Sequence, residues 1–167
     1  KFFIYTFCAS VIMLLGLMTL YFLMPEGSST SGGYGSVTNR TFDLKVILTY
    51  AANQNANGEV FLGKNLQYIL FAMLMIGFLV KLPAVPFHTW LPDAHVQAPT
   101  GGSMLLAGVM LKMGAYGMLR IPIAIFPDAV IFYQDIIMAI GLISLVWGSI
   151  VCLGQTNLKK MVAYSSV

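Results

Sequence analysis

Four long apolar segments constrain this chain more than any other feature of its sequence. They cover residues 2–24, 66–80, 104–119 and 129–153. A helix needs about 20 largely apolar residues to cross a bilayer. Only 9% of the residues are charged, against about 25% in soluble domains, and the mean hydropathy is +0.82. The sequence therefore predicts an all-α, polytopic bundle of transmembrane helices.

The regions around these segments complete the predicted order of elements in a single membrane domain. We expect transmembrane helices at 2–24, 64–87, 103–120 and 129–153, the start of another helix from residue 157, and an extramembrane loop at 25–63. Residues 26–40 are rich in Gly, Ser and Thr, which is typical of a flexible loop. Thr41 is a candidate cap for a surface helix over 42–52, which the polar residues 53–55 would end.

Several function classes are disfavoured by composition. The net charge of +3 is spread along the chain, so no basic face for nucleic acid is expected. Cys8 and Cys152 lie in apolar runs without ligand spacing, which indicates buried structural thiols. No phosphate-binding loop, cysteine cluster or haem motif occurs, so we expect no cofactor and no redox centre within this chain.

Two prolines directly after Lys81 predict a break in the second transmembrane helix. Proline has no backbone N–H and clashes with the preceding turn. Pro83 and Pro86 would therefore leave the carbonyl groups of Leu79 and Leu82 without their helical partners. A broken helix beside a charged side chain is the arrangement that transporters use for ion sites. The alternative is a kinked helix ending at the membrane surface, with the Lys81 amine reaching the headgroups.

Lys112 lies near the middle of the third apolar segment. Eight residues precede it in that segment and seven follow it. At about 1.5 Å per residue, helix extends roughly 11–12 Å on either side, which is more than a lysine side chain spans comfortably. On an α-helix Gly108 and Ala115 would share its face and leave room for water. The alternative is a structural salt bridge, although the segment itself holds no carboxylate.

His88 is a candidate proton relay, because an imidazole titrates near neutral pH and His88 follows the predicted break. The alternative is a histidine bonded to a carbonyl at a helix end. His88 and His95 are seven residues apart with Asp93 nearby, but a metal site needs three or four ligands. We therefore predict no metal site.

The residues of the predicted break resemble a known family. Residues 80–95, VKLPAVPFHTWLPDAH, are similar to the antiporter-like subunits of respiratory complex I, the NADH:quinone oxidoreductase. Residues 106–120, LAGVMLKMGAYGMLR, resemble the M type of these subunits more than the L or N types, and residues 98–103 and 155–167 fit the same family. The resemblance covers the chain except for the loop at 26–63.

The resemblance implies that the chain is a fragment of a larger antiporter-like fold, with the helix around Lys81 broken. It implies that Lys81 and Lys112 are protonatable residues of a buried hydrated axis, with His88 near it, and that all three take part in proton translocation. A glutamate on a preceding helix would pair with Lys81. The L-, N- and K-type membrane subunits would be partners. Quinone, FMN and iron–sulfur clusters would be bound by other subunits, and quinone reduction there would drive proton translocation in a bacterial or archaeal cytoplasmic membrane.

Rival functions remain open at this point, and the first is a related dehydrogenase fed by an electron donor other than NADH. A subunit of an Mrp-type sodium/proton antiporter or of a membrane-bound hydrogenase would share the same lysine-bearing helices. A membrane scaffold of another class, which transports nothing, would use the lysines only in structural ion pairs. Loss of proton transport on replacing Lys112 by Met, in a complex that still assembles, would argue against the scaffold.

Overall fold

The computed structural model describes residues 2–23, 42–56 and 63–167, and the expected loop at 26–40 and its following cap, Thr41, lie outside these ranges. The described residues contain helices and turns but no strand, so the all-α prediction is confirmed. The α-helices are α1 (Phe2–Leu23), α2 (Leu44–Ala56), α3 (Lys64–Lys81), α4 (Trp90–Gln97), α5 (Thr100–Leu105), α6 (Leu111–Arg120), α7 (Pro122–Ile125), α8 (Pro127–Leu153) and α9 (Leu158–Ser166). A π-helical turn, Leu106–Met110, joins α5 to α6.

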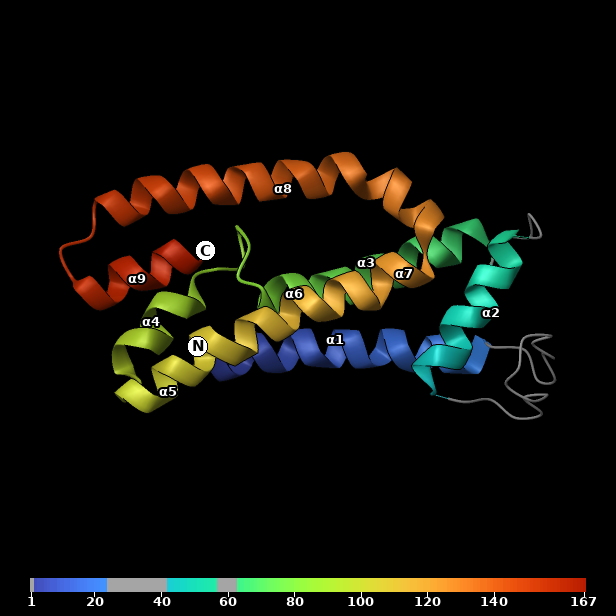
Figure 1. The fold of residues 1–167 in the computed structure, drawn as a ribbon, viewed down its shortest axis with the longest axis horizontal. Helices are drawn as coiled ribbons and strands as arrows, with labels where there is room; N and C mark the ends of the chain where they lie inside the picture. The colour runs from blue at the N-terminus through green and yellow to red at the C-terminus, as the bar shows by residue number, and fades with distance from the viewer. Residues whose placement is uncertain (1, 24–41, 57–62) are drawn as a thin grey trace.

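Four stretches of the described residues are long and apolar enough to cross a membrane. They are Phe2–Leu23, Lys64–Lys81, Thr100–Ile125 and Pro127–Leu153. The third stretch runs from α5 through α7. In Figure 1, α1, α3 and α6 lie along one another, while α8 runs along the other side of the bundle.

Glycines set the close approach of α3 to its two neighbours. A Cβ atom on Gly77 would lie 2.7 Å from the Cβ of Met13 in α1, so only glycine fits there. A Cβ on Gly117 of α6 would overlap the ring of Phe78 in α3. Small residues at such contacts allow transmembrane helices to pack by their backbones.

Two separate hydrophobic clusters lie at opposite ends of α3. The larger joins the first part of α3 to α1, α2 and the α7–α8 junction and contains Leu20, Ile47, Ala51, Leu70, Phe71, Leu74, Met75, Ile125, Phe126 and Ala129. The smaller contains Trp90, Leu91, Leu106 and Leu111, beyond the end of α3. Gln67 in the first turn of α3 is fully buried, and within the described residues neither atom of its amide has a hydrogen-bond partner.

Two expectations about local structure were wrong. Helix α2 continues through residues 53–55 to Ala56, so these polar residues do not end it. Cys8 is exposed and Cys152 is half-buried, whereas both thiols were expected to be buried. Helix α1 buries the face that carries Ala9, Gly16 and Leu20, and Cys8 lies outside that face.

Candidate functional site

Helix α3 ends at Lys81, two residues before Pro83. The N–H of Leu82 makes the last helical bond, to the carbonyl oxygen of Phe78 at 2.7 Å. The next residue, Pro83, has no N–H to continue the ladder. Residues 82–89 form turns, and α4 begins at Trp90. The lysine is therefore the last residue of a helix that stops within the protein.

Two backbone carbonyl groups at the end of α3 accept hydrogen bonds from residues beyond the break. The carbonyl of Leu79 lacks the helical partner that Pro83 cannot supply, as expected, but it accepts the N–H of Ala84, one residue further on, at 3.2 Å. The carbonyl of Val80 accepts the indole N–H of Trp90 at 3.0 Å. An unpaired backbone group in a medium without water costs several kcal/mol. These bonds make the broken helix compatible with an apolar environment.

A third bond connects the break to a distant helix. The N–H of Val85 donates to the Oγ of Ser144 in α8 at 2.9 Å. The Ser144 hydroxyl in turn donates to the carbonyl of Ile140 in its own helix at 2.7 Å. In Figure 1, the loop that follows α3 rises from the bundle towards α8.

Lys81 is half-buried and lines a cavity of about 530 Å³ among α1, α3, α4 and α6. Thr6 and Ser10 of α1 contribute hydroxyl groups to its wall, whose other members are Phe2, Phe78, Trp90, Leu106, Met110, Leu111, Met113 and Gly114. Thr6 and Ser10 are four residues apart, so they lie on one face of α1. The wall holds an amine and two hydroxyls but no carboxylate.

Gly114 of α6 brings a second helix against the backbone of Lys81. A Cβ on Gly114 would lie 3.3 Å from the Cβ of Lys81 and 3.2 Å from the N of Leu82. Both distances are tighter than ordinary van der Waals contact. The absence of a side chain at position 114 therefore lets α6 pack against the backbone at Lys81 and Leu82.

Lys112 is exposed in the described part of the chain and does not line the cavity around Lys81. It precedes Gly114 by two residues, so the two point to nearly opposite sides of α6. The turn before Lys112 is π-helical, because the N–H of Leu111 bonds to the carbonyl of Leu106 five residues earlier.

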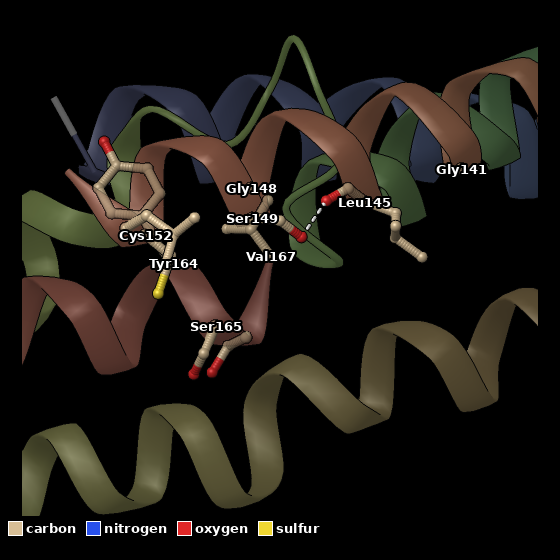
Figure 2. A pocket seen from close by; sticks show the side chains of 10 residues that line it. Gly141, Leu145, Gly148, Ser149, Cys152, Tyr164, Ser165 and Val167 are labelled. Atoms are coloured by element: carbon tan, nitrogen blue, oxygen red, sulfur yellow. Dashed lines mark hydrogen bonds between the residues drawn. The ribbon is translucent and has the colours of Figure 1, made fainter. Parts of the chain in front are cut away.

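His88 lies on another side of the break. Its ring is buried and approaches the ring of Tyr164 in α9, with centroids 6.3 Å apart. Tyr164 lines a second cavity, about 710 Å³, between α8 and α9 (Figure 2). Lys81 and His88 are thus not brought into one cavity. His88 lies outside the four candidate spans, and burial lowers the pKa of its imidazole.

His95 links α4 to α5. Its Nδ1 lies 2.6 Å from the Oγ of Ser103, while its ring is buried and its Nε2 has no partner among the described residues. Burial lowers the pKa of His95, which also lies outside the candidate spans. Over the described ranges, no three His, Cys, Asp or Glu side chains gather closely enough to hold a metal ion.

Sequence reasoning missed the side chains that hold the break. Trp90, Ser144 and Ser103 were not among the expected site residues. The role of Trp90 could have been predicted, because a buried indole N–H needs an acceptor and nearby carbonyl groups were expected to lack their helical partners. The role of Ser144 could not have been predicted from the sequence, because Ser144 lies 59 residues from Val85 in an apolar helix.

Helix α3 stops at a half-buried lysine inside an apolar bundle, and the indole of Trp90 and the hydroxyl of Ser144 hold the backbone at the break. This arrangement defines the class of membrane proteins with a transporter-type discontinuous helix. Residues 1–167 match the family described as NADH:quinone oxidoreductase/Mrp antiporter, TM. The chain belongs to this family, and it is an integral membrane protein.

Curated relatives carry names from one branch of the family. The chain is 41% identical over its whole length to the NADH-quinone oxidoreductase subunit M of Rickettsia conorii. It is 40% identical to subunit M of Rhodobacter capsulatus and 37% identical to the NADH-ubiquinone oxidoreductase chain 4 of Chondrus crispus, again over its whole length. It spans 29–30% of the length of these relatives.

Proposed function

We propose that this chain is part of a proton-translocating membrane subunit of an NADH:quinone oxidoreductase, in which Lys81 takes up and releases protons. The observation that carries the proposal is the position of Lys81 at the end of α3, in a cavity walled by the hydroxyls of Thr6 and Ser10. An amine there can exchange a proton with water held by the hydroxyls. The relatives named as subunit M or chain 4 support the choice of complex.

The electrostatics of a partly desolvated lysine provide a mechanism. Burial disfavours the charged amine, whereas a nearby carboxylate favours it. A change in the charge or distance of such a carboxylate would therefore switch Lys81 between holding and releasing a proton. The cavity wall contains no carboxylate, so we propose that one is contributed by a part of the longer subunit.

Lys112 and His88 have separate places in this proposal. Lys112 leaves α6 on the side away from Lys81, so a proton passing between the two amines must go around α6 through water. His88 would serve a path on the α9 side of the break, next to Tyr164. We propose neither residue as a direct hydrogen-bond partner of Lys81.

Electron transfer would occur outside this chain. We propose that FMN, iron–sulfur clusters and quinone are bound by other subunits of the complex, and that L-, N- and K-type membrane subunits are neighbours. The described residues of this chain would then act without redox chemistry, through protonation alone. The bacterial relatives favour a bacterial membrane as its location.

Substituting Lys81 in the full-length subunit of the assembled complex tests the proposal. Lys81→Met removes the amine. Lys81→Arg keeps a positive charge that is never released at physiological pH. Both variants are expected to lose most proton transport, measured as acidification of inverted membrane vesicles during NADH oxidation. Lys64→Met is the control, because Lys64 is exposed at the other end of α3.

The arginine variant separates a proton carrier from a scaffold. If Lys81 only makes a structural ion pair, Lys81→Arg retains the pair and transports protons normally. That result would overturn the proposal. Co-purification of the subunit with flavin and iron–sulfur proteins distinguishes the oxidoreductase from an Mrp-type antiporter.

A further inference from the structure

Ser144 holds the tip of the helix break from the opposite helix. Its hydroxyl accepts the N–H of Val85 at 2.9 Å and donates to the carbonyl of Ile140 at 2.7 Å. The residue is 6% exposed, so bulk water does not compete for either bond. One hydroxyl therefore joins the break to α8.

Val85 needs an acceptor from elsewhere in the fold. It lies between Pro83 and Pro86, where the helical ladder of α3 has already ended. Val85 is half-buried, and an N–H held away from water without a partner costs free energy. Helix α8 supplies the acceptor although it buries only Ala129, Ser144 and Gly148.

Each of the three buried residues of α8 has a different neighbour. Ala129 belongs to the hydrophobic cluster at the α7–α8 junction. Gly148 lies against Tyr164 and Val167, at the α9 side. Ser144 is the buried residue of α8 that bonds to the break. The hydroxyl thus forms the contact by which α8 can influence the segment after Lys81.

The backbone around Lys81 is fixed on both of its sides. Before it, the carbonyl of Val80 is held by Trp90. After it, Leu82 bonds back to Phe78, and the next described bond to another helix is that of Val85 to Ser144. Without the Ser144 bond, the described backbone hydrogen bonds of residues 82–85 would run only to α3, from Leu82 to Phe78 and from Ala84 to Leu79.

We infer that Ser144 is a positioning residue for Lys81: by binding the N–H of Val85 it fixes the turn that follows the lysine and so holds the amine in its cavity. This inference rests on the proposed proton-carrying role of Lys81. Loss of the hydroxyl leaves the Lys81 amine chemically intact but frees the turn at residues 82–85. The amine then spends less time in the position from which it exchanges protons.

The test uses substitutions in the full-length subunit within the intact complex. Ser144→Ala removes the acceptor at nearly constant volume, and Ser144→Thr restores a hydroxyl. Ser149→Ala is the matched control. Ser149 lies on the same helix and makes the same kind of bond, from its Oγ to the carbonyl of Leu145 at 2.7 Å (Figure 2), but it is exposed. If Ser144→Ala does not assemble, Ser144→Cys serves as the test variant, because a thiol is a weaker acceptor of similar shape.

Hydrogen exchange measures the bond directly. In the purified complex, the amide of Val85 in a peptide covering residues 82–90 is expected to exchange about fivefold faster in Ser144→Ala, in keeping with the loss of one hydrogen bond. Exchange in Ser149→Ala is expected to equal that of the unsubstituted complex. Unchanged exchange in Ser144→Ala would overturn the inference, whatever Lys81 does.

Proton transport measures the positioning role. Ser144→Ala is expected to lower the number of protons moved per NADH oxidised at least twofold, with partial recovery in Ser144→Thr. If the Val85 amide exchanges faster in Ser144→Ala but proton transport stays normal, the Ser144 bond holds the turn without positioning Lys81. That result would also overturn the inference. The Lys81→Met variant separates the two ideas. If that variant transports normally, the proposed function has failed independently of the exchange result at Val85.

Discussion

The indole N–H of Trp90 donates to the carbonyl oxygen of Val80, ten residues earlier and on the other side of the helix break, at 3.0 Å. The ring is 3% exposed and belongs to the smaller hydrophobic cluster. One side chain therefore joins the end of α3 to the start of α4 and fills the core beside them.

Trp90→Phe is expected to destabilise the assembled subunit by about 1–3 kcal/mol, because the buried carbonyl of Val80 loses its donor while most of the aromatic contact remains. The thermal denaturation temperature of the purified complex provides the measurement. Trp147→Phe is the matched control, since Trp147 is 49% exposed on α8. Equal denaturation temperatures for the two variants would contradict the role given to the indole N–H.

Gly114→Ala is expected to disturb Lys81 through its backbone. The added methyl group would lie 3.2–3.3 Å from Leu82 and Lys81, and overpacking of this kind costs about 1–3 kcal/mol. We expect lower proton transport and a lower denaturation temperature. Gly108→Ala is the control, because nothing lies within 4 Å of its added methyl group. A fully active Gly114→Ala complex would show that α6 does not constrain the lysine.

Gln67→Met is expected to leave stability unchanged or to raise it. The amide of Gln67 is buried and unpaired within the described residues, and removing such a group restores about 1–3 kcal/mol of desolvation cost. Methionine has similar length and fills irregular space well. The denaturation temperature of the purified complex is again the measurement. A marked decrease would mean that the amide has a partner in the complete subunit.

The stability of the α4–α5 region is expected to fall in mild acid. Because burial lowers the pKa of His95 below its ordinary value of 6.5, the unfolded chain binds more protons than the folded one near that pH. Stability is therefore complete above pH 6.5 and is lost as the pH falls towards the folded-state pKa. His88 acts in the same direction.

Denaturation temperatures measured between about pH 7.5 and pH 5.5 test this dependence. His95→Gln should remove part of the decrease, and the double variant with His88→Gln should remove more. Ser103→Ala separates protonation from hydrogen bonding, because it removes the partner of Nδ1 and leaves the imidazole in place. If His95→Gln keeps the full pH dependence, the titrating group lies elsewhere.

Local chemistry predicted the helices and the break because both depend on neighbouring residues. The apolar segments define α1, α3 and α8, and Pro83 explains why α3 stops after Lys81. The groups that complete the break were not predictable in the same way. Ala84 reaches the carbonyl of Leu79 through a turn geometry that a spacing rule does not contain. Ser144 reaches Val85 only through the tertiary fold.

The candidate site residues were chosen from their chemistry, and their arrangement could not be predicted from the sequence. A lysine in an apolar segment indicates a polar interior from composition alone. Which cavity receives each side chain depends on helix rotation, so the separation of Lys81 from His88 and Lys112 required the structure. The π-helical turn at Leu106–Met110 adds to this, since no residue type in it identifies it.

That wide turn changes how distances along the third span are counted. A π turn accommodates about one more residue than an α turn, so it behaves as a single inserted residue between α5 and α6. Side chains on either side of it align at spacings one residue longer than usual. Two turns before Lys112, the aligned position is therefore about eight residues back rather than seven. Deleting one residue from Leu106–Met110 would then keep the Lys112 amine on its present side, whereas a deletion within α6 itself would swing the following residues by about 100°.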